Sequence, residues 1–122
     1  MQLYAVENSG HVRGYFLLAS VPGQVRIADC WMDSPAPADW RGLILCAIDQ
    51  ARQDPRGAEI VAWASDPLLT EVLRSCGFHA RFTCPIGVRP SVPGTIAAGT
   101  LRVQMLDNDD AFLCLSRNEY WG

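Results

Sequence analysis

The chain has 122 residues, a formal net charge of −3 and 49% hydrophobic residues. This length suits one folded domain with a single core, and the apolar content excludes an intrinsically disordered chain. The negative net charge argues against a protein that binds nucleic acids or anionic membranes through a basic surface. The ten basic residues are all arginine, which excludes lysine chemistry such as a Schiff base. We expect one domain over residues 1–122.

The amino-terminal stretch MQLYAVENSG lacks the basic start and apolar run of a signal peptide. No apolar run reaches the length that spans a membrane. We therefore expect a cytoplasmic protein that binds neither membrane nor nucleic acid.

The five cysteines are scattered and odd in number, and they contain no C-x-x-C pair. Cys46 is assigned to the apolar face of an expected helix. The pattern predicts mostly buried, reduced thiols that hold neither a disulfide nor a metal: Cys30, Cys46, Cys76, Cys84 and Cys114.

The first third of the chain predicts an antiparallel meander of three strands, over residues 3–6, 12–21 and 24–32. The first two are joined by the turn cluster of residues 7–10. The second and third are joined by Pro22-Gly23, a typical tight turn.

After the third strand the apolar residues recur at the spacing of an amphipathic helix. They form one apolar stripe: Trp40, Leu43, Ile44, Ala47, Ile48 and Ala51. Asp39 or Ser34 is expected to cap its start, and residues 54–57 to end it. Residues 59–65 follow as a strand whose nearly continuous apolar run predicts a central strand covered on both faces.

A second helix is predicted from the pair Asp66-Pro67, with Asp66 as its N-cap and Gly77 as its left-handed end. Strands over residues 80–88 and 100–106 and a short helical turn from Ala111 complete the chain. The order β-β-β-α-β-α-β-β predicts an α/β fold, an α+β mixed sheet with a parallel crossover around the first helix.

The stretch SDPLLTEVLRSCGF is similar to a helix motif of the GNAT superfamily of N-acetyltransferases, N-x-x-A-x-x-x-Y-x-x-x-G-F. The positions that match in spacing are Asp66, Leu69, Leu73, Gly77 and Phe78. LRVQMLDNDDAFL resembles the closing strand of a bacterial GNAT-like group. The likeness covers the carboxy-terminal two thirds of that fold, so it implies a domain without the first strand and first two helices.

The resemblance implies acetyl-CoA as the cofactor if one is bound. The pantetheine arm would contact the main chain of one strand, and the pyrophosphate would contact the loop and helix start that follow. The corresponding residues here are Ala28, Cys30, Trp31, Met32, Ala38, Trp40 and Arg41.

Several residues depart from the family pattern. Pro35, Ala38 and Trp40 stand in the glycine-rich loop, and Pro35 and Pro37 have no N–H for an anion. Asp33 and Asp39 add negative charge beside it. Leu73 replaces the tyrosine that protonates the departing thiolate in the family.

We therefore expect a non-catalytic binding or assembly module with weak or no acetyl-CoA binding and no catalytic residue. Two alternatives stay open. One is an acetyl-CoA-dependent N-acyltransferase, whole or as half of a larger enzyme. The other is a binder of a small apolar ligand.

Other candidate residues have simpler interpretations. We expect Trp40 in the core, not stacked on a ligand, and Asp66 as a cap, not a general base. Arg81 and Arg102 are expected to be solvated on strand faces. Metal binding by Cys76, His79 and Cys84, and a cysteine nucleophile beside His11 or His79, have little support from spacing. A turn is favoured over a calcium site at Asp107, Asn108, Asp109 and Asp110.

A sheet without its family's first strand leaves residues 3–6 as an open, apolar edge. We expect an uncovered sheet face as well, which would expose side chains from Tyr4, Phe16, Leu18 or their neighbours. The chain is therefore predicted to form a homodimer through its N-terminal strands, by strand exchange or edge pairing through residues 2–6 and 12–20. Phe16→Asp or Tyr4→Asp is expected to give monomers or aggregates.

Overall fold

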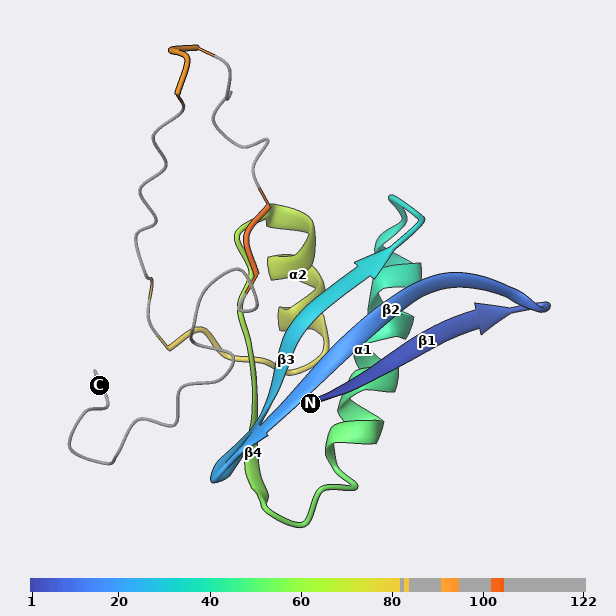
Figure 1. Cartoon of the computed structure of the whole chain (residues 1–122), viewed down its shortest axis with the longest axis vertical. Helices are drawn as coiled ribbons and strands as arrows, with labels where there is room; N and C mark the ends of the chain where they lie inside the picture. Colours follow the sequence, from blue (N-terminus) through green and yellow to red (C-terminus); the bar gives the residue numbers. More distant parts are fainter. Residues whose placement is uncertain (82, 84–90, 95–101, 105–122) are drawn as a thin grey trace.

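The computed structural model describes residues 1–81, 83, 91–94 and 102–104. It is an α+β fold with a four-stranded mixed sheet and two helices (Figure 1). In chain order the elements are β1 (Gln2–Asn8), β2 (His11–Val21), β3 (Gly23–Met32), α1 (Pro37–Ala51), β4 (Gly57–Ala62) and α2 (Pro67–Ser75). This order confirms the expected one as far as α2. The expected strands over 80–88 and 100–106 lie mostly, and the turn from Ala111 wholly, outside the described residues.

The sheet order is β1-β2-β3-β4. The first three strands pair antiparallel, and β4 pairs parallel to β3. Tight turns suffice for the antiparallel pairs, and Gly10 and Gly23 supply the positive φ values that those turns need. A parallel pair needs a crossover, which α1 makes. Both helices lie behind the same face of the sheet (Figure 1).

The core lies between this face and the two helices. All six residues of the expected α1 stripe are buried. They pack against inward-facing residues of β2 and β3 and against the buried side of α2: Phe16, Leu18, Val25, Ile27, Leu69, Val72 and Leu73. Burial of one large apolar side chain contributes about 1.5–3 kcal/mol, so this layer contact is the main source of stability.

The ends of α2 follow the sequence signals. Asp66 is the N-cap, and its Oδ1 accepts from the Leu69 N–H at 2.9 Å. Pro67 stands in the first turn, where its missing N–H costs nothing. Gly77 has φ 91°, and the Phe78 N–H donates to the Leu73 carbonyl at 3.0 Å, which closes the helix.

The expected cap of α1 is wrong. Its N-cap is Ala36, which makes no side-chain cap bond, and the helix begins at Pro37. Ser34 Oγ instead accepts from the Ala36 N–H at 3.1 Å, and Asp39 lies inside the first turn. Pro37 has a fixed φ that suits a first helical residue, so it starts the helix without a side-chain cap.

The expected central position of β4 stays a prediction, because the strands expected after it lie mostly outside the described residues. Among the described residues β4 is the end strand of the sheet, and its residues Gly57–Ala62 are exposed or half-buried. An apolar run is equally compatible with a half-covered strand, because periodicity cannot separate the two cases.

The face of the sheet turned away from the helices bears the neighbours of Phe16 and Leu18 and not these two residues themselves. Phe16 and Leu18 are 2% and 4% exposed under α1, and Tyr4 stacks on Phe16 with ring centroids 4.9 Å apart. The face turned away from the helices carries Leu3, which is 69% exposed, and its neighbour Leu17. Strand alternation defines two faces but does not say which one the helices cover. Phe16→Asp would therefore place a charge in the core and unfold the chain.

The expected burial of the thiols holds for Cys30 and fails for Cys46, which is exposed, while Cys76 is half-buried. Cys46 lies about 100° around α1 from the buried Ala47, outside the apolar stripe. Cys84 and Cys114 lie outside the described residues. In the described part of the chain no helix is long and apolar enough to cross a membrane.

Two leucines of α1, one on either side of Ile44, allow a matched stability test. Leu43 is fully buried and Leu45 is 43% exposed. We expect Leu43→Ala to lower the free energy of unfolding by about 2–5 kcal/mol, because it leaves a cavity. Leu45→Ala should change it by no more than about 0.5 kcal/mol. Urea denaturation measures both, and equal losses would contradict this packing of α1.

Candidate functional site

The candidate site lies where β3 and β4 separate. Their pairing runs from Gly23 opposite Gly57 to Ile27 opposite Ala62, and β3 then continues to Met32 with β2 on one side and no described strand on the other. The residues that the resemblance assigns to a pantetheine arm, 28–32, lie on this part of β3, which pairs with β2 only. An exposed main chain at such a divergence can pair with an extended ligand or with another part of the protein.

A β-bulge marks the start of this segment. Leu17 pairs with Asp29 and Leu18 with Ile27, which leaves Ala28 as the extra residue of β3. The side-chain alternation changes there. Ile27 and Cys30 both join the core under the helices, whereas Ala28 packs on the other face. The bulge therefore turns the Cys30 side chain into the core.

The side chain of Gln104 fills the divergence. Its Oε1 accepts from the Cys30 N–H at 2.9 Å, and its Nε2 donates to the Cys30 carbonyl at 2.6 Å. A primary amide carries both a donor and an acceptor, so it supplies the two bonds that a neighbouring strand would supply. Gln104 is buried, and Cys30 therefore has both main-chain groups satisfied inside the protein. Sequence patterns miss Gln104, because one glutamine in a strand is an ordinary surface residue.

The segment that carries Gln104, residues 102–104, forms hydrogen bonds with the rest of the protein at two further residues. The Val103 N–H donates to Ser65 Oγ at 2.7 Å. Arg102 Nε donates to Asp66 Oδ2 at 2.9 Å, and the Arg102 guanidinium lies 4.2 Å from the centroid of the Trp40 ring. Asp66 thus caps α2 with one oxygen and holds Arg102 with the other.

Arg102 corrects an expectation, since its side chain is mostly covered by other residues. About a third of its side chain is exposed, and a cation stacked on tryptophan contributes about 0.5–2 kcal/mol. Arg81 does fit the expectation of exposure, at 70%, although it pairs with Glu59 Oε2 at 2.7 Å.

Trp40 belongs to the core, as expected. It is 2% exposed, and its indole Nε1 donates to the Ser34 carbonyl at 2.6 Å. The indole therefore pins the loop that precedes α1 against the start of that helix. The resemblance assigns a glycine-rich anion loop to this position, and here the buried indole fills it.

The amides at the start of α1 offer little to an anion. Pro37 has no N–H, and the N–H groups of Asp39 and Trp40 point at the Ala36 carbonyl. Ala38 and Arg41 are exposed. Arg13 lies 2.7 Å from Asp33 and 4.0 Å from Asp39, and the hydrogen bond to Asp33 raises its pKa. The Arg13 guanidinium is thus already paired with two carboxylates of the protein.

Cys30 is a poor nucleophile. Burial is the main cause that raises the pKa of its thiol to about 12, so the thiol stays protonated at neutral pH. Its Sγ lies 3.4 Å from Gln104 Oε1. His11 and His79 are both exposed, whereas Cys30 is buried. Leu73, at the position of the family tyrosine, is buried beside Val72 in the core.

Within the described ranges, no three or more His, Cys, Asp or Glu side chains are grouped so that they could hold a metal ion. Cys84, one ligand of the weak metal candidate, lies outside those ranges, and so does the calcium candidate over residues 107–110. Both candidates stay untested.

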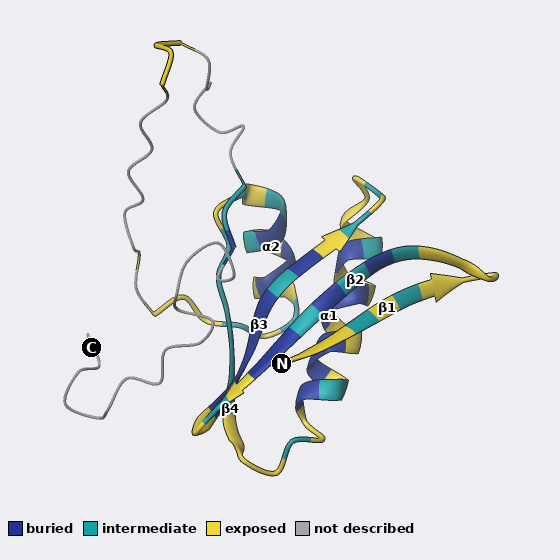
Figure 2. Cartoon of the chain, in the orientation of Figure 1, coloured by how far each residue is buried: buried dark blue, intermediate teal, exposed yellow. Residues whose placement is uncertain are grey.

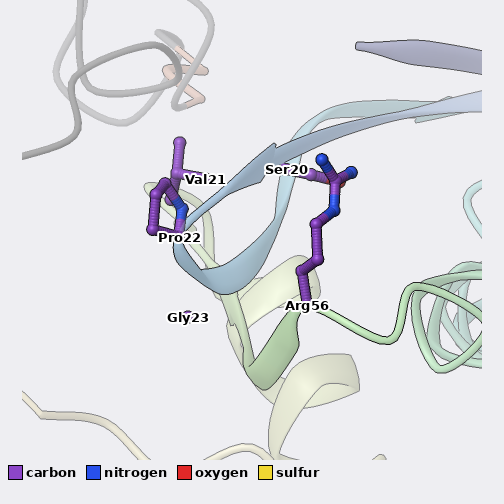
Figure 3. A pocket seen from close by; sticks show the side chains of 5 residues that line it. All are labelled: Ser20, Val21, Pro22, Gly23 and Arg56. Atoms are coloured by element: carbon purple, nitrogen blue, oxygen red, sulfur yellow. The ribbon is translucent and has the colours of Figure 1, made fainter.

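Two hollows lie at the opposite end of β3 from Cys30. One, of about 330 Å³, is lined by Ser20, Val21, Pro22, Gly23 and Arg56. Figure 3 shows Arg56 extending toward Ser20, with the turn residues Val21, Pro22 and Gly23 on the other side of the view. Arg56 also forms two side-chain bonds with Asp54, which lower the pKa of that carboxyl.

The second hollow, of about 620 Å³, lies between the start of β1 and the end of α1. Its lining is largely polar: Met1, Gln2, Tyr4, Leu18, Ser20, Val25, Gln50, Ala51, Gln53, Asp54, Pro55 and Arg56. Neither hollow resembles the enclosed apolar cavity that a small apolar ligand prefers.

Comparison of the chain with protein-family models, curated proteins and solved structures found no match. The fold and the geometry of the site therefore carry the functional argument.

The two roles of Asp66 can be separated by substitution. Asn caps a helix as well as Asp does, so Asp66→Asn removes only the ion pair with Arg102. Both partners are partly exposed, and we expect a loss of about 0–1 kcal/mol in the free energy of unfolding. Asp66→Ala also removes the cap and should cost about 1 kcal/mol more. Equal losses in urea denaturation would mean that the cap contributes nothing.

Proposed function

We propose that this chain is a GNAT-like domain that does not use acetyl-CoA and acts as a non-catalytic binding or assembly module. The strand order supports the resemblance: three antiparallel strands, then a parallel fourth strand reached through α1. The motif positions Asp66, Gly77 and Phe78 also adopt the roles of cap, left-handed stop and packing residue.

One observation carries the proposal, namely the double hydrogen bond between the Gln104 amide and the Cys30 main chain. A pantetheine arm would need these same main-chain groups. It would have to displace an internal amide and leave that amide buried or force the segment 102–104 away. Each buried polar group left without a partner costs about 1–3 kcal/mol, and each 1.4 kcal/mol is a tenfold loss of affinity.

The start of α1 supports the same conclusion. The pyrophosphate of the cofactor would need free N–H groups and positive potential. Here Pro37 lacks the donor, Trp40 fills the space, and Asp33 and Asp39 stand nearby with Arg13 bound to them.

An acyltransferase would also need a group that protonates the departing thiolate. Leu73 cannot donate a proton, and Cys30 is deep in the core. The enzymatic alternative and the apolar-ligand alternative thus have no observation in their favour among the described residues.

Isothermal calorimetry with acetyl-CoA tests the proposal. We expect no saturable heat at low micromolar concentrations of wild-type protein. Gln104→Ala is the informative variant, because it frees the Cys30 main chain, and any binding should appear first there. Trp40→Gly is unsuitable, since loss of a buried tryptophan costs about 3–5 kcal/mol of stability. A one-site isotherm for the wild type would refute the proposal.

A further inference from the structure

β1 is the end strand of the described sheet, and its outer edge is suited to pair with a further strand. It runs for seven residues, Gln2–Asn8, and no described strand lies on its outer side (Figures 1 and 2). Half of the N–H and C=O groups of such a strand point away from its only neighbour.

The devices that usually protect an edge are absent from β1. It contains no proline and no lysine, and its one charge is Glu7. The irregularity in its pairing with β2 falls between Val6 and Glu7, where the extra residue, Arg13, belongs to β2. The segment from Gln2 to Val6 is therefore a regular edge.

We propose that β1 pairs antiparallel with β1 of a second copy, about a two-fold axis through Ala5. With the axis normal to the sheet, residues that stand opposite each other share a face. Tyr4 then stands opposite the partner's Val6, Leu3 opposite the partner's Glu7, and Gln2 opposite the partner's Asn8.

The strand sequence favours this register over its neighbours. It pairs all seven residues of β1 and keeps the two Glu7 side chains apart. A two-residue shift toward Tyr4 would place Gln2 opposite the partner's Val6. A shift toward Val6 would place Tyr4 opposite the partner's Asn8. Both shifts set a polar residue against an apolar one on the helix side, whereas the Ala5 register sets apolar against apolar.

The apolar pair would continue the existing core. Tyr4 and Val6 are half-buried and already pack against the core cluster at its rim. The pairing of Tyr4 with the partner's Val6 therefore joins the rims of two cores beneath one continuous sheet.

The larger hollow supports the same placement. It adjoins Gln2 and Tyr4 on the helix side of β1, and the amides of Gln50 and Gln53 line it. In the Ala5 register the partner's Asn8 stands beside Gln2 and so faces the mouth of this hollow. The polar lining matches a polar occupant.

This inference deepens the proposed assembly role and rests on it, but the two fail separately. Acetyl-CoA binding would refute the proposed function without changing the mass of the particle. A monomeric protein would refute the dimer without restoring a cofactor site.

Sedimentation at several concentrations, with charged substitutions on the axis, tests the dimer. The wild type should approach twice its chain mass of 13.4 kDa at high concentration. Ala5 is exposed, so Ala5→Lys should fold normally but place two like charges opposite each other and yield monomers. Ala5→Glu should do the same, and an equimolar mixture of the two variants should restore a dimer. Ala58→Lys, the same change on exposed β4, is the matched control and should leave the dimer intact.

Three results would overturn the inference. One is a wild type that stays monomeric at every concentration. Another is an Ala5→Lys variant that dimerises as strongly as the wild type. The last is a mixture of Ala5→Lys and Ala5→Glu that remains monomeric although circular dichroism shows both variants folded.

Discussion

The structure depends on how one stretch of backbone finds its hydrogen-bond partners. Where β4 leaves β3, the Cys30 N–H and C=O point away from β2 to a side with no described strand, and buried main-chain groups must be satisfied. The Gln104 amide satisfies both. Once it does so, Arg102 and Val103 come into reach of Asp66 and Ser65, and the segment is fixed against β3 and the start of α2.

The same contact determines what the divergence between the strands can do. In an open form, the separated ends of β3 and β4 would present main-chain groups to an extended ligand. Here an internal side chain takes them, the Trp40 indole fills the neighbouring helix start, and Arg102 covers that indole. The bulge at Ala28 turns Cys30 inward, where burial keeps its thiol protonated. These features agree with the proposed assembly role, in which the unpaired edge of β1 and not this divergence is the binding surface.

Local signals in the sequence predicted the elements well. The apolar stripe of α1 and the cap and stop of α2 were found because each depends on residues within a few positions of one another. The sequence was less informative about which face of the sheet is covered and which side chains are buried. The sequence does not tell whether Phe16 and Leu18 or their strand neighbours face solvent, since alternation alone does not say which side the helices cover. Gln104 could not be found at all, because its partner Cys30 lies 74 residues away and no pattern links them.

The most direct test of the account is amide hydrogen exchange at Cys30, measured by NMR on the wild type and on Gln104→Ala. If the Gln104 amide holds the Cys30 main chain, the Cys30 N–H exchanges slowly in the wild type. In Gln104→Ala it should exchange much faster, while amides inside α1 keep their protection. A Cys30 amide that exchanges rapidly in the wild type, or equally slowly in both proteins, would contradict the account.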